Sequence, residues 1–450
     1  MQRAKTTPTW EAAFAHWCEP FLAALSREAQ RRWAPLYLKG LLGPGERKSV
    51  EPMAARVCPA DVQQLHHFVA AAPWATEPLE RVLAAEAQRL VGGAGAVLII
   101  DDTTFAKQGW HSVGVARQYC GALGKRANCQ TLVSLTLAKR EVPVALALRL
   151  YLPEEWAADP TRCGKAGVPE GLGFRRKWRI ALEELDRIRA AGVTFDVVLA
   201  DAGYGTCAEF RRELSARALT WAVGILSTQK VYPTHVRLAA PKKPPTGRPQ
   251  RHPVPSAPSV PAEAVIAALG PAAFRRLSWR RSTEGPLTAD FAACRVRVAD
   301  GPPMARAQHL PGEAAWLVCE RRGRGEVKYY LTNHPASATR RELACAIKAR
   351  WSCEQTHQQL KEELGLDHYE GRSWRGLHHH VLLTTIAFAF LQHLRLREKN
   401  RRGPPRATAR AIAPGGAGAA AGAARARRPA PVPAVPSPRS RGTARVKVAE

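Results

Sequence analysis

The first part of the chain carries apolar residues at three- and four-residue steps, which is the spacing of one face of an α-helix. Trp10, Phe14 and Trp17 follow this spacing, and it recurs over residues 79–90. The pattern predicts an N-terminal helical domain over residues 1–92. Its charge is mixed, so two interpretations stay open: a domain that contacts DNA, or a helical bundle with only a structural role.

After residue 92 the pattern changes to short, continuous apolar runs, which are typical of strands buried on both faces. Strands are predicted over residues 97–100, 112–120, 129–138, 142–152, 195–200 and 220–226, and helices over residues 174–191 and 206–218. Strands followed by alternating helices indicate an α/β architecture, with a mixed sheet flanked by helices. Residues 93–226 are therefore predicted to form the first part of a core domain.

The next region is β-rich and interrupts the α/β order. Its first part, residues 229–260, is rich in Pro, Lys and Arg and predicts an exposed loop. Short strand patterns follow at residues 295–298, 315–319 and 329–332. We expect residues 227–335 to be an insertion in the core.

Two helical patterns return after the insertion. One long helix is predicted over residues 339–364 and an apolar helix over residues 381–396, so residues 336–398 complete the core. Residues 399–450 are mostly Ala, Gly, Pro and Arg without hydrophobic periodicity. Such a composition predicts a disordered basic tail.

The composition is strongly basic and indicates a polyanionic partner. The formal net charge is +29 and the isoelectric point is about 10.4. The segment from Lys399 onward holds 12 Lys and Arg residues and one acid, which leaves a net charge of +18 on the rest of the chain. Such an excess favours nucleic acid through counterion release and long-range attraction.

The cysteines and the apolar runs indicate a cellular compartment. Ten cysteines are scattered without a C-x-x-C pair, which suggests neither a zinc site nor a disulfide framework and favours free thiols in a reducing environment. The chain starts without an apolar signal core. Its longest apolar run, residues 381–391, is too short to span a bilayer. These features predict a cytoplasmic protein with no membrane partner.

Three acidic residues stand at positions suited to chemistry. Asp102 and Asp201 each end an apolar strand pattern, and ligand-binding residues of open α/β sheets gather beyond the carboxyl ends of strands. Glu354 lies on the predicted long helix. At 100° per residue, Arg350 and Lys361 fall within about 40° of it. One face of that helix therefore carries a carboxylate between two cations.

Carboxylates in this order suit hard divalent cations. Mg²⁺ or Mn²⁺ prefers oxygen ligands, and we expect two such ions to be held by Asp102, Asp201 and Glu354 over a phosphodiester. Arg350 and Lys361 would then bind flanking phosphates. Another interpretation stays open for each motif alone: a strand-end Asp as a turn or helix cap, and the helix residues as exposed ion pairs.

The order of these motifs resembles the ribonuclease H-like core of the DDE transposases encoded by bacterial insertion sequences. The helix is similar to their Tyr-x2-Arg-x3-Glu-x6-Lys signature, which is matched by Arg350, Glu354 and Lys361. In the first-aspartate motif of that family, the metal ligand directly precedes a Thr. This similarity favours Asp102 over Asp101 as the ligand.

Further segments resemble the branch known as DDE superfamily endonucleases, namely residues 112–119, 124–130 and 364–367 with Arg372-Ser373. The resemblance covers about residues 10–395. It implies a ribonuclease H-like fold and a Mg²⁺- or Mn²⁺-dependent transposase that cleaves double-stranded DNA at element ends and transfers the strand into target DNA. It also implies a homodimer in the synaptic complex and an association with the bacterial nucleoid.

Some features depart from the family pattern or stand outside it. Ile347 replaces the signature Tyr, and this with the unusual tail leaves an alternative open: a catalytically inactive, transposase-derived DNA-binding protein or repressor. The run His378-His379-His380 is not expected to bind zinc, because consecutive residues point in different directions on a helix. The family similarity hints that His380 meets a phosphate. Trp279 is expected to pack on a sheet face rather than stack on bases.

Overall fold

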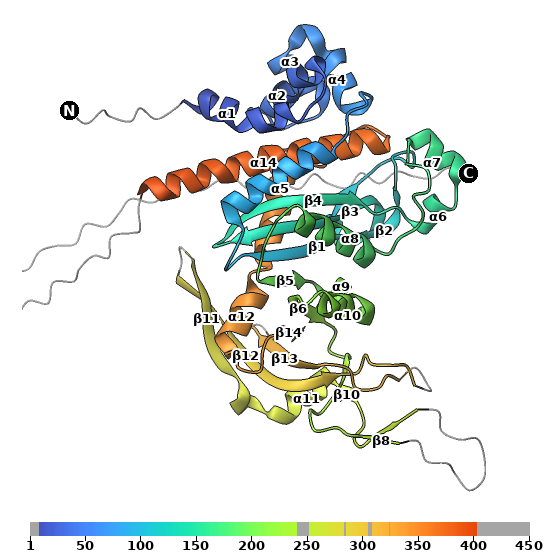
Figure 1. The fold of residues 1–450 in the computed structure, drawn as a ribbon, viewed down its shortest axis with the longest axis vertical. Coiled ribbons are helices and arrows are strands. Elements are labelled where there is room, and N and C mark those ends of the chain that lie inside the picture. The colour runs from blue at the N-terminus through green and yellow to red at the C-terminus, as the bar shows by residue number, and fades with distance from the viewer. Residues whose placement is uncertain (1–8, 241–251, 283–284, 305–307, 324, 403–450) are drawn as a thin grey trace, which may run out of the picture. The chain divides into compact units, whose positions relative to one another are not determined.

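The computed structural model describes residues 9–240, 252–282, 285–304, 308–323 and 325–402 (Figure 1). The predicted basic tail beyond residue 402 and residues 241–251 of the predicted loop lie outside the described residues. Within the described ranges, no helix combines the length and apolar character needed to cross a membrane.

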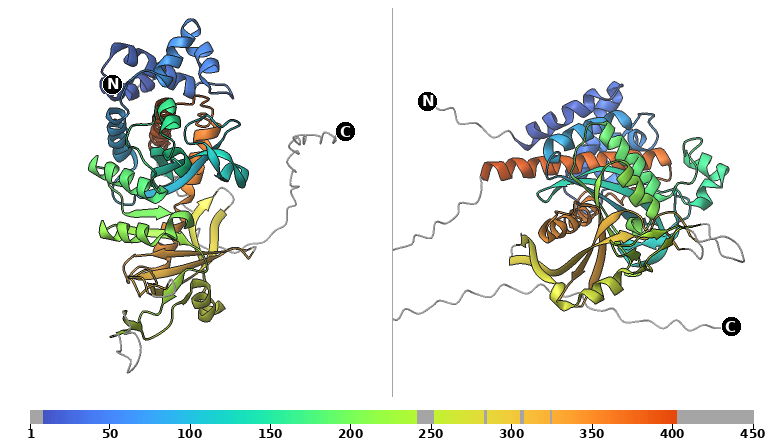
Figure 2. Two further views of the ribbon diagram at one scale, coloured as in Figure 1. Left: turned by 90° about the vertical axis from the view of Figure 1, so that its right-hand side faces the viewer. Right: turned by 60° about the horizontal axis from the view of Figure 1, so that its bottom comes forward.

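Five N-terminal helices bury their apolar stripes against one another and against the last helix, α14 (Trp374–Arg402). They are α1 (Trp10–Ala23), α2 (Glu28–Leu42), α3 (Val50–Val57), α4 (Val62–Ala70) and α5 (Glu77–Val91). The rings of Phe14 and Trp17 on α1 lie 5.4 and 6.0 Å from that of Phe390 on α14. Figure 2 shows α14 between α1–α4 and the sheet. The three- and four-residue spacing thus corresponds to a packed helical layer.

A mixed sheet forms the centre of the core. Its central strands follow the order β4-β3-β1-β5-β6. They are β1 (Val97–Ala106), β3 (Lys125–Lys139), β4 (Val142–Leu150), β5 (Val197–Ala200) and β6 (Thr220–Ile225). β5 runs parallel to β1 and to β6, whereas β3 is antiparallel to β1. This sheet with its flanking helices confirms the predicted α/β class with a mixed sheet.

Short helices follow the strands of the core. They are α6 (Glu154–Ala157), α7 (Pro160–Ala166), α8 (Lys177–Ala190), α9 (Ala202–Gly205) and α10 (Ala208–Ala216). The helix predicted over residues 206–218 is confirmed as α10, and the single turn α9, which was not predicted, precedes it. The strand predicted over residues 112–120 is shorter than expected, because only β2 (Ala116–Cys120) pairs with β3.

The segment 227–335 continues the same sheet beyond β6, since β14 pairs antiparallel with β6. Its strands are β7 (Lys230–Tyr232), β10 (Val260–Pro261), β11 (Arg275–Ser282), β12 (Gly285–Val298), β13 (Ala314–Arg321) and β14 (Val327–Thr332), with β8 (Leu238–Ala239), β9 (Val254–Pro255) and helix α11 (Ala262–Leu269) beside them. β11 was not predicted, because Leu277 and Trp279 are its only apolar side chains and arginines surround them.

The prediction of one long helix over residues 339–364 is wrong. The structure has two helices, α12 (Arg340–Lys348) and α13 (Trp351–Glu362), with a turn at residues 349–350 between them. At this turn the amide of Cys353 donates to the carbonyl of Arg350, three residues back, so the hydrogen-bond ladder of an α-helix is interrupted. α14 is longer than the helix predicted over residues 381–396.

Successive side chains of β1 point to opposite faces of the sheet and belong to two separate apolar clusters. Ile99 packs with Ile347 and Cys353, so this face of the sheet is covered by α12 and α13. Leu98 and Ile100 belong to the main core on the opposite face. The two acidic residues that follow Ile100 consequently begin on different faces of one strand.

Candidate active site

Asp101 lies on the face of the sheet that α13 covers. Its neighbour across the β1–β3 pair is Ser134, whose hydroxyl donates to the Asp101 carbonyl at 3.1 Å and lies 2.7 Å from Nε2 of His357 on α13. The Asp101 carboxylate pairs with Nη1 of Arg350 at 2.5 Å. Asp101 is therefore connected to the turn that begins α13.

Asp102 faces the other side of β1 and has two different partners. Nζ of Lys177, at the start of α8, lies 2.7 Å from its Oδ2, and the hydroxyl of Tyr204 donates to its Oδ1 at 2.6 Å. Tyr204 also donates its backbone N–H to Oδ1 of Asp201 at 3.2 Å. One tyrosine thus links the two predicted aspartates directly.

Asp201 is held where β5 turns into α9, and it caps that single-turn helix. The turn lies tightly against β6, because a Cβ on Gly205 would lie 2.0 Å from the carbonyl oxygen of Gly224. Arg211, buried on α10, donates to the Gly205 carbonyl and pairs with Asp300 of the insertion at 2.8 Å. Glycine and these contacts fix the position of Asp201.

Glu354 is not in contact with the aspartates. Its Oε1 pairs with Nη2 of Arg350 at 2.5 Å, and its side chain is 62% exposed. Arg350 therefore lies between Glu354 and Asp101 and contacts both. Among the described residues, no group of three His, Cys, Asp or Glu side chains is arranged to hold a metal ion.

The aspartates are crowded together in a partly buried place, where burial and mutual repulsion disfavour their charged forms. Burial raises the pKa of Asp101 to about 7; Arg350 lowers it, while Asp201 and Asp102 raise it further. Burial also raises the pKa of Asp201, and the nearby charge of Asp102 adds to this. Carboxylates that resist ionisation for these reasons become fully charged when a cation binds between them. The donor set, all carboxylate oxygen, suits a hard divalent cation.

Lys361 does not lie beside Glu354 as a free cation. Its Nζ donates to the carbonyl of Thr104 on β1 at 3.0 Å, and burial lowers the pKa of its ammonium group. Ile347, at the signature Tyr position, is buried in the cluster under the sheet. Of the predicted residues, the structure brings Asp102 close to Asp201 and Arg350 to Glu354. Lys361, on α13, instead contacts the Thr104 carbonyl of β1.

The hint that His380 meets a phosphate is wrong in this structure. His380 is buried, with Nδ1 2.8 Å from the Tyr37 hydroxyl and Nε2 3.2 Å from the Leu366 carbonyl. His379 is buried too, stacked on Trp74 with ring centroids 3.6 Å apart. His379 and His380 anchor α14 to the N-terminal helices, whereas His378 bonds the carbonyl of Trp374 on α14 itself. No metal site forms from them within the described residues.

Trp279 packs as expected, at the edge of the cluster under the sheet. Its ring meets Phe291 edge to face at a centroid distance of 6.0 Å, and Nζ of Lys348 lies 4.4 Å from its centroid. The interpretation as a residue that packs on a sheet face therefore fits the structure.

Sequence reasoning missed three residues of the site. Tyr204 stands three residues after Asp201 in the sequence, but its link to Asp102 depends on the fold. Lys177 and His357 carry no motif. Lys177 reaches Asp102 on β1 and His357 reaches Ser134 on the neighbouring β3 only because α8 and α13 pack on opposite faces of the sheet.

The model of the family of DDE superfamily endonucleases matches residues 20–286. The chain belongs to this family. The matched range contains Asp101, Asp102 and Asp201 and ends before Glu354. Membership of this DDE family implies use of a divalent metal ion, in agreement with the all-carboxylate donor set.

Two known proteins are similar to this DDE family member. It is 30% identical over 194 residues to a probable transposase for insertion sequence element IS701 from Microchaete diplosiphon, covering 43% of this chain and 48% of that protein. The chain thus spans about half the length of this relative. It is also similar to a cryo-EM structure of the piggyBac transposase synaptic complex with hairpin DNA, with a TM-score of 0.39 and 10% identity over 88% of this chain and 74% of that one.

Proposed function

We propose that this DDE family member is the transposase of an insertion sequence, which cleaves DNA at the element ends and joins the freed 3′-hydroxyl to target DNA. The observation that carries the proposal is the meeting of Asp102, within β1, and Asp201, which follows β5, beside the Arg350–Glu354 pair. The partial similarity to a probable insertion-sequence transposase and the strong positive charge of the chain support it.

In this proposal, Asp102, Asp201 and Glu354 hold two Mg²⁺ or Mn²⁺ ions. When bound, the ions supply a nucleophile at neutral pH and charge stabilisation for the leaving oxygen. Glu354 joins the aspartates only after Arg350 releases it, because the same guanidinium pairs with Glu354 and Asp101. A released Arg350 is then a planar, bidentate ligand for a phosphate of the DNA. We assign Lys361 the same kind of contact as a point charge.

The domain roles follow from the same proposal. Residues 93–226 and 336–398 supply the aspartates and Glu354, and residues 227–335 extend their sheet. We propose that residues 1–92 contribute to DNA binding, that two copies of the chain assemble on paired element ends, and that the protein acts at the bacterial nucleoid. The partner in each case is double-stranded DNA, as element end and as target.

The decisive experiment changes Asp201→Asn, which keeps the shape of the side chain and removes its charge. We expect Mg²⁺-dependent cleavage of a duplex with the element end to fall about a thousandfold, by the loss of a cation ligand, while binding of the duplex is retained. Asp61→Asn, at an exposed ion pair with Arg32, is the matched control. Cleavage retained by the Asp201 variant would overturn the proposal.

The same experiment tests the inactive DNA-binding alternative. That function is favoured by one observation, the pairing of Glu354 with Arg350 instead of with the aspartates. A wild-type protein that binds the element end and never cleaves it, at any Mg²⁺ or Mn²⁺ concentration, would establish the alternative.

A further inference from the structure

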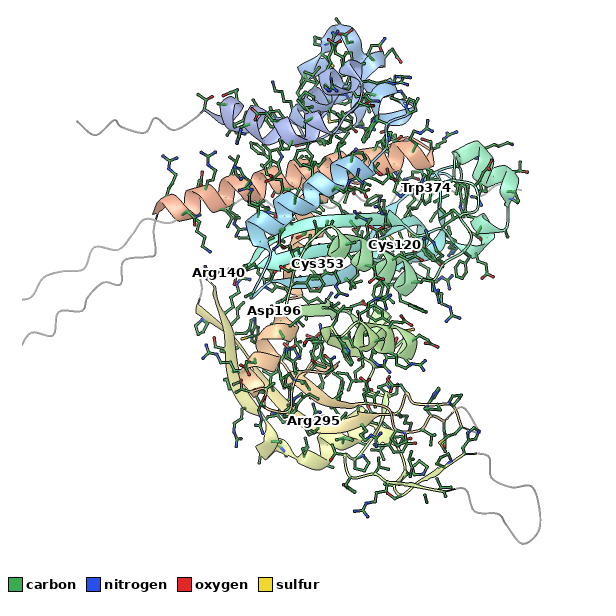
Figure 3. The ribbon with its side chains drawn as sticks, viewed as in Figure 1. Cys120, Arg140, Asp196, Arg295, Cys353 and Trp374 are labelled. Atoms are coloured by element: carbon green, nitrogen blue, oxygen red, sulfur yellow. The ribbon has the colours of Figure 1, made fainter. Side chains whose placement is uncertain are left out.

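A cationic groove lies at the opposite end of the central strands from the aspartates. The last turn of α5, the turn between β3 and β4, and the C-terminal part of α14 line it, and it encloses about 410 Å³. Its charged or titratable lining side chains are Arg89, Lys139, Arg140, His393, Arg397 and Lys399, and the described lining contains no Asp or Glu. Figure 3 labels Arg140 at the β3–β4 turn, and Figure 1 shows this turn below the end of α14.

The β3–β4 turn has an unusual backbone for its residues. Lys139 pairs with Val142, so the turn consists of Arg140 and Glu141 alone, with φ values of 49° and 67°. Two-residue turns with both φ values positive strongly favour Asn and Gly, because other side chains are strained there. Glu141 pairs with Arg280 of β11 at 2.8 Å, which stabilises the turn. Arg140 is exposed, without an ion-pair partner in the described part of the chain.

Ordinary structural roles explain only part of this charge. Arg89 pairs with Glu86 at 2.5 Å, and Lys139 donates to the Gly92 carbonyl at 3.1 Å. Cations are also favoured at helix C-termini, where each dipole is equivalent to about half a negative charge. Neither effect applies to Arg140, which lies on a strand turn. Arg397 and Lys399 are exposed and lack a carboxylate partner among the described residues.

The groove continues toward the proposed active site. A second cavity shares Lys139 and Arg140 with the groove and extends to Arg280 and Trp351. The guanidinium of Arg280 lies 3.8 Å from the centroid of the Trp351 ring, and Trp351 directly follows Arg350. The cationic surface therefore runs from α14 to the turn that begins α13.

The spacing along β1 fits a DNA duplex. Val97 pairs with Ala138 beside the β3–β4 turn, and Asp101 is four residues further along β1. At about 3.3 Å per residue this separation is about 13 Å. Successive phosphates of one DNA strand advance about 3.4 Å along the axis. A duplex aligned with β1, with its cleavage point at the aspartates, would thus present phosphates to the β3–β4 turn at least about four base pairs away.

We propose that Arg140, Arg397 and Lys399 bind the phosphate backbone of the duplex beside the cleavage point. This inference rests on the proposed function, which makes double-stranded DNA the polyanion present at this distance. The three exposed cations act by charge, without reading the base sequence. They hold the DNA near the opposite end of β1 from the aspartates, so the duplex is bound at two places.

The test uses the full chain with Arg140, Arg397 and Lys399 all changed to Ala. These side chains are exposed, so the fold should be retained. Binding of a DNA duplex of about 30 base pairs is measured by fluorescence anisotropy at several salt concentrations. We expect the slope of log affinity against log salt to fall by about 2 to 3, since each phosphate contact contributes about 0.9. Affinity at 0.1 M salt should fall at least tenfold.

The matched control changes three exposed cations elsewhere, Lys165, Arg189 and Arg237, to Ala. An equal loss in this control would overturn the inference, because net charge alone would then explain the effect. If the groove variant keeps the wild-type slope of log affinity against log salt, and the wild-type protein cleaves DNA, only the inference about the groove is overturned. A loss seen with an RNA duplex and not with DNA would also overturn it. A wild-type protein without salt-dependent DNA binding or cleavage would overturn the proposed function itself.

Discussion

The two faces of β1 hold neighbouring aspartates in contrasting surroundings. Asp101 faces α13, where Arg350 neutralises it together with Glu354. Asp102 faces α8 and α9, where Lys177 and Tyr204 bind both of its oxygens. Each aspartate thus already has a cationic partner from the protein. Protein cations thus occupy the acidic centre on both faces of β1, and under the proposed function a divalent ion would have to replace them.

The largest expected effect distinguishes the two faces. Asp102→Asn should reduce Mg²⁺-dependent cleavage about a thousandfold through loss of a metal ligand, and Asp101→Asn should reduce it much less. Cleavage rates of the two variants under one set of conditions decide this. A larger loss of cleavage in the Asp101 variant would identify Asp101, on the α13 face, as the metal ligand. Equal losses in the two variants would mean that the two faces of β1 do not differ in this role.

A smaller effect is expected at the residue that connects Asp101 with Glu354. Arg350→Lys should reduce cleavage about tenfold to a hundredfold. The planar guanidinium of Arg350 can contact two carboxylates, or bind a phosphate through two hydrogen bonds, and an ammonium group cannot replace it in either role. Arg341→Lys, an exposed position on α12, is the control. Single-turnover cleavage rates measure the change. If the Arg350→Lys variant cleaves at the wild-type rate, Arg350 has no role in cleavage.

The α13 face should also respond to pH through a buried histidine. Burial lowers the pKa of His357 to about 3, next to Ser134. The folded form keeps the ring neutral, while the unfolded chain takes up a proton below about pH 6.5. Stability should therefore fall as pH drops from 6.5 toward 3, by up to about 1.4 kcal/mol per pH unit from this group. His357→Gln should show a shallower decrease of Tm with falling pH. Parallel Tm curves would contradict this account.

The smallest effect concerns the α8 face. Lys177→Met removes the ammonium group that competes for Asp102, so Mn²⁺ alone should bind a few-fold more tightly, by up to about tenfold. Isothermal titration calorimetry without DNA measures this, with Lys165→Met as the control. Weaker Mn²⁺ binding in the Lys177 variant would mean that the lysine orients Asp102 for the metal instead of competing with it.

Much of the fold and part of the site followed from local patterns. The apolar runs before Asp102 and Asp201 predicted buried strands, and both residues lie at or near the ends of such runs in β1 and β5. The sequence pattern gave wrong or missing predictions where the polarity of the side chains did not match the secondary structure that they form. β11 is a strand of arginines around two apolar residues, and the predicted long helix is broken at residues 349–350.

By itself, the sequence determined the α/β class, the positive charge and which acids follow buried apolar runs, because strand and helix periods and composition are local properties. It did not determine where β1 ends, since that strand continues beyond Asp102 to Ala106. Only the tertiary structure decided which groups meet. The contact of Lys177 with Asp102 joins residues 75 positions apart, and that of Arg350 with Asp101 joins residues 249 positions apart. Such contacts depend on which helix packs on which face of β1, and no local pattern encodes that choice.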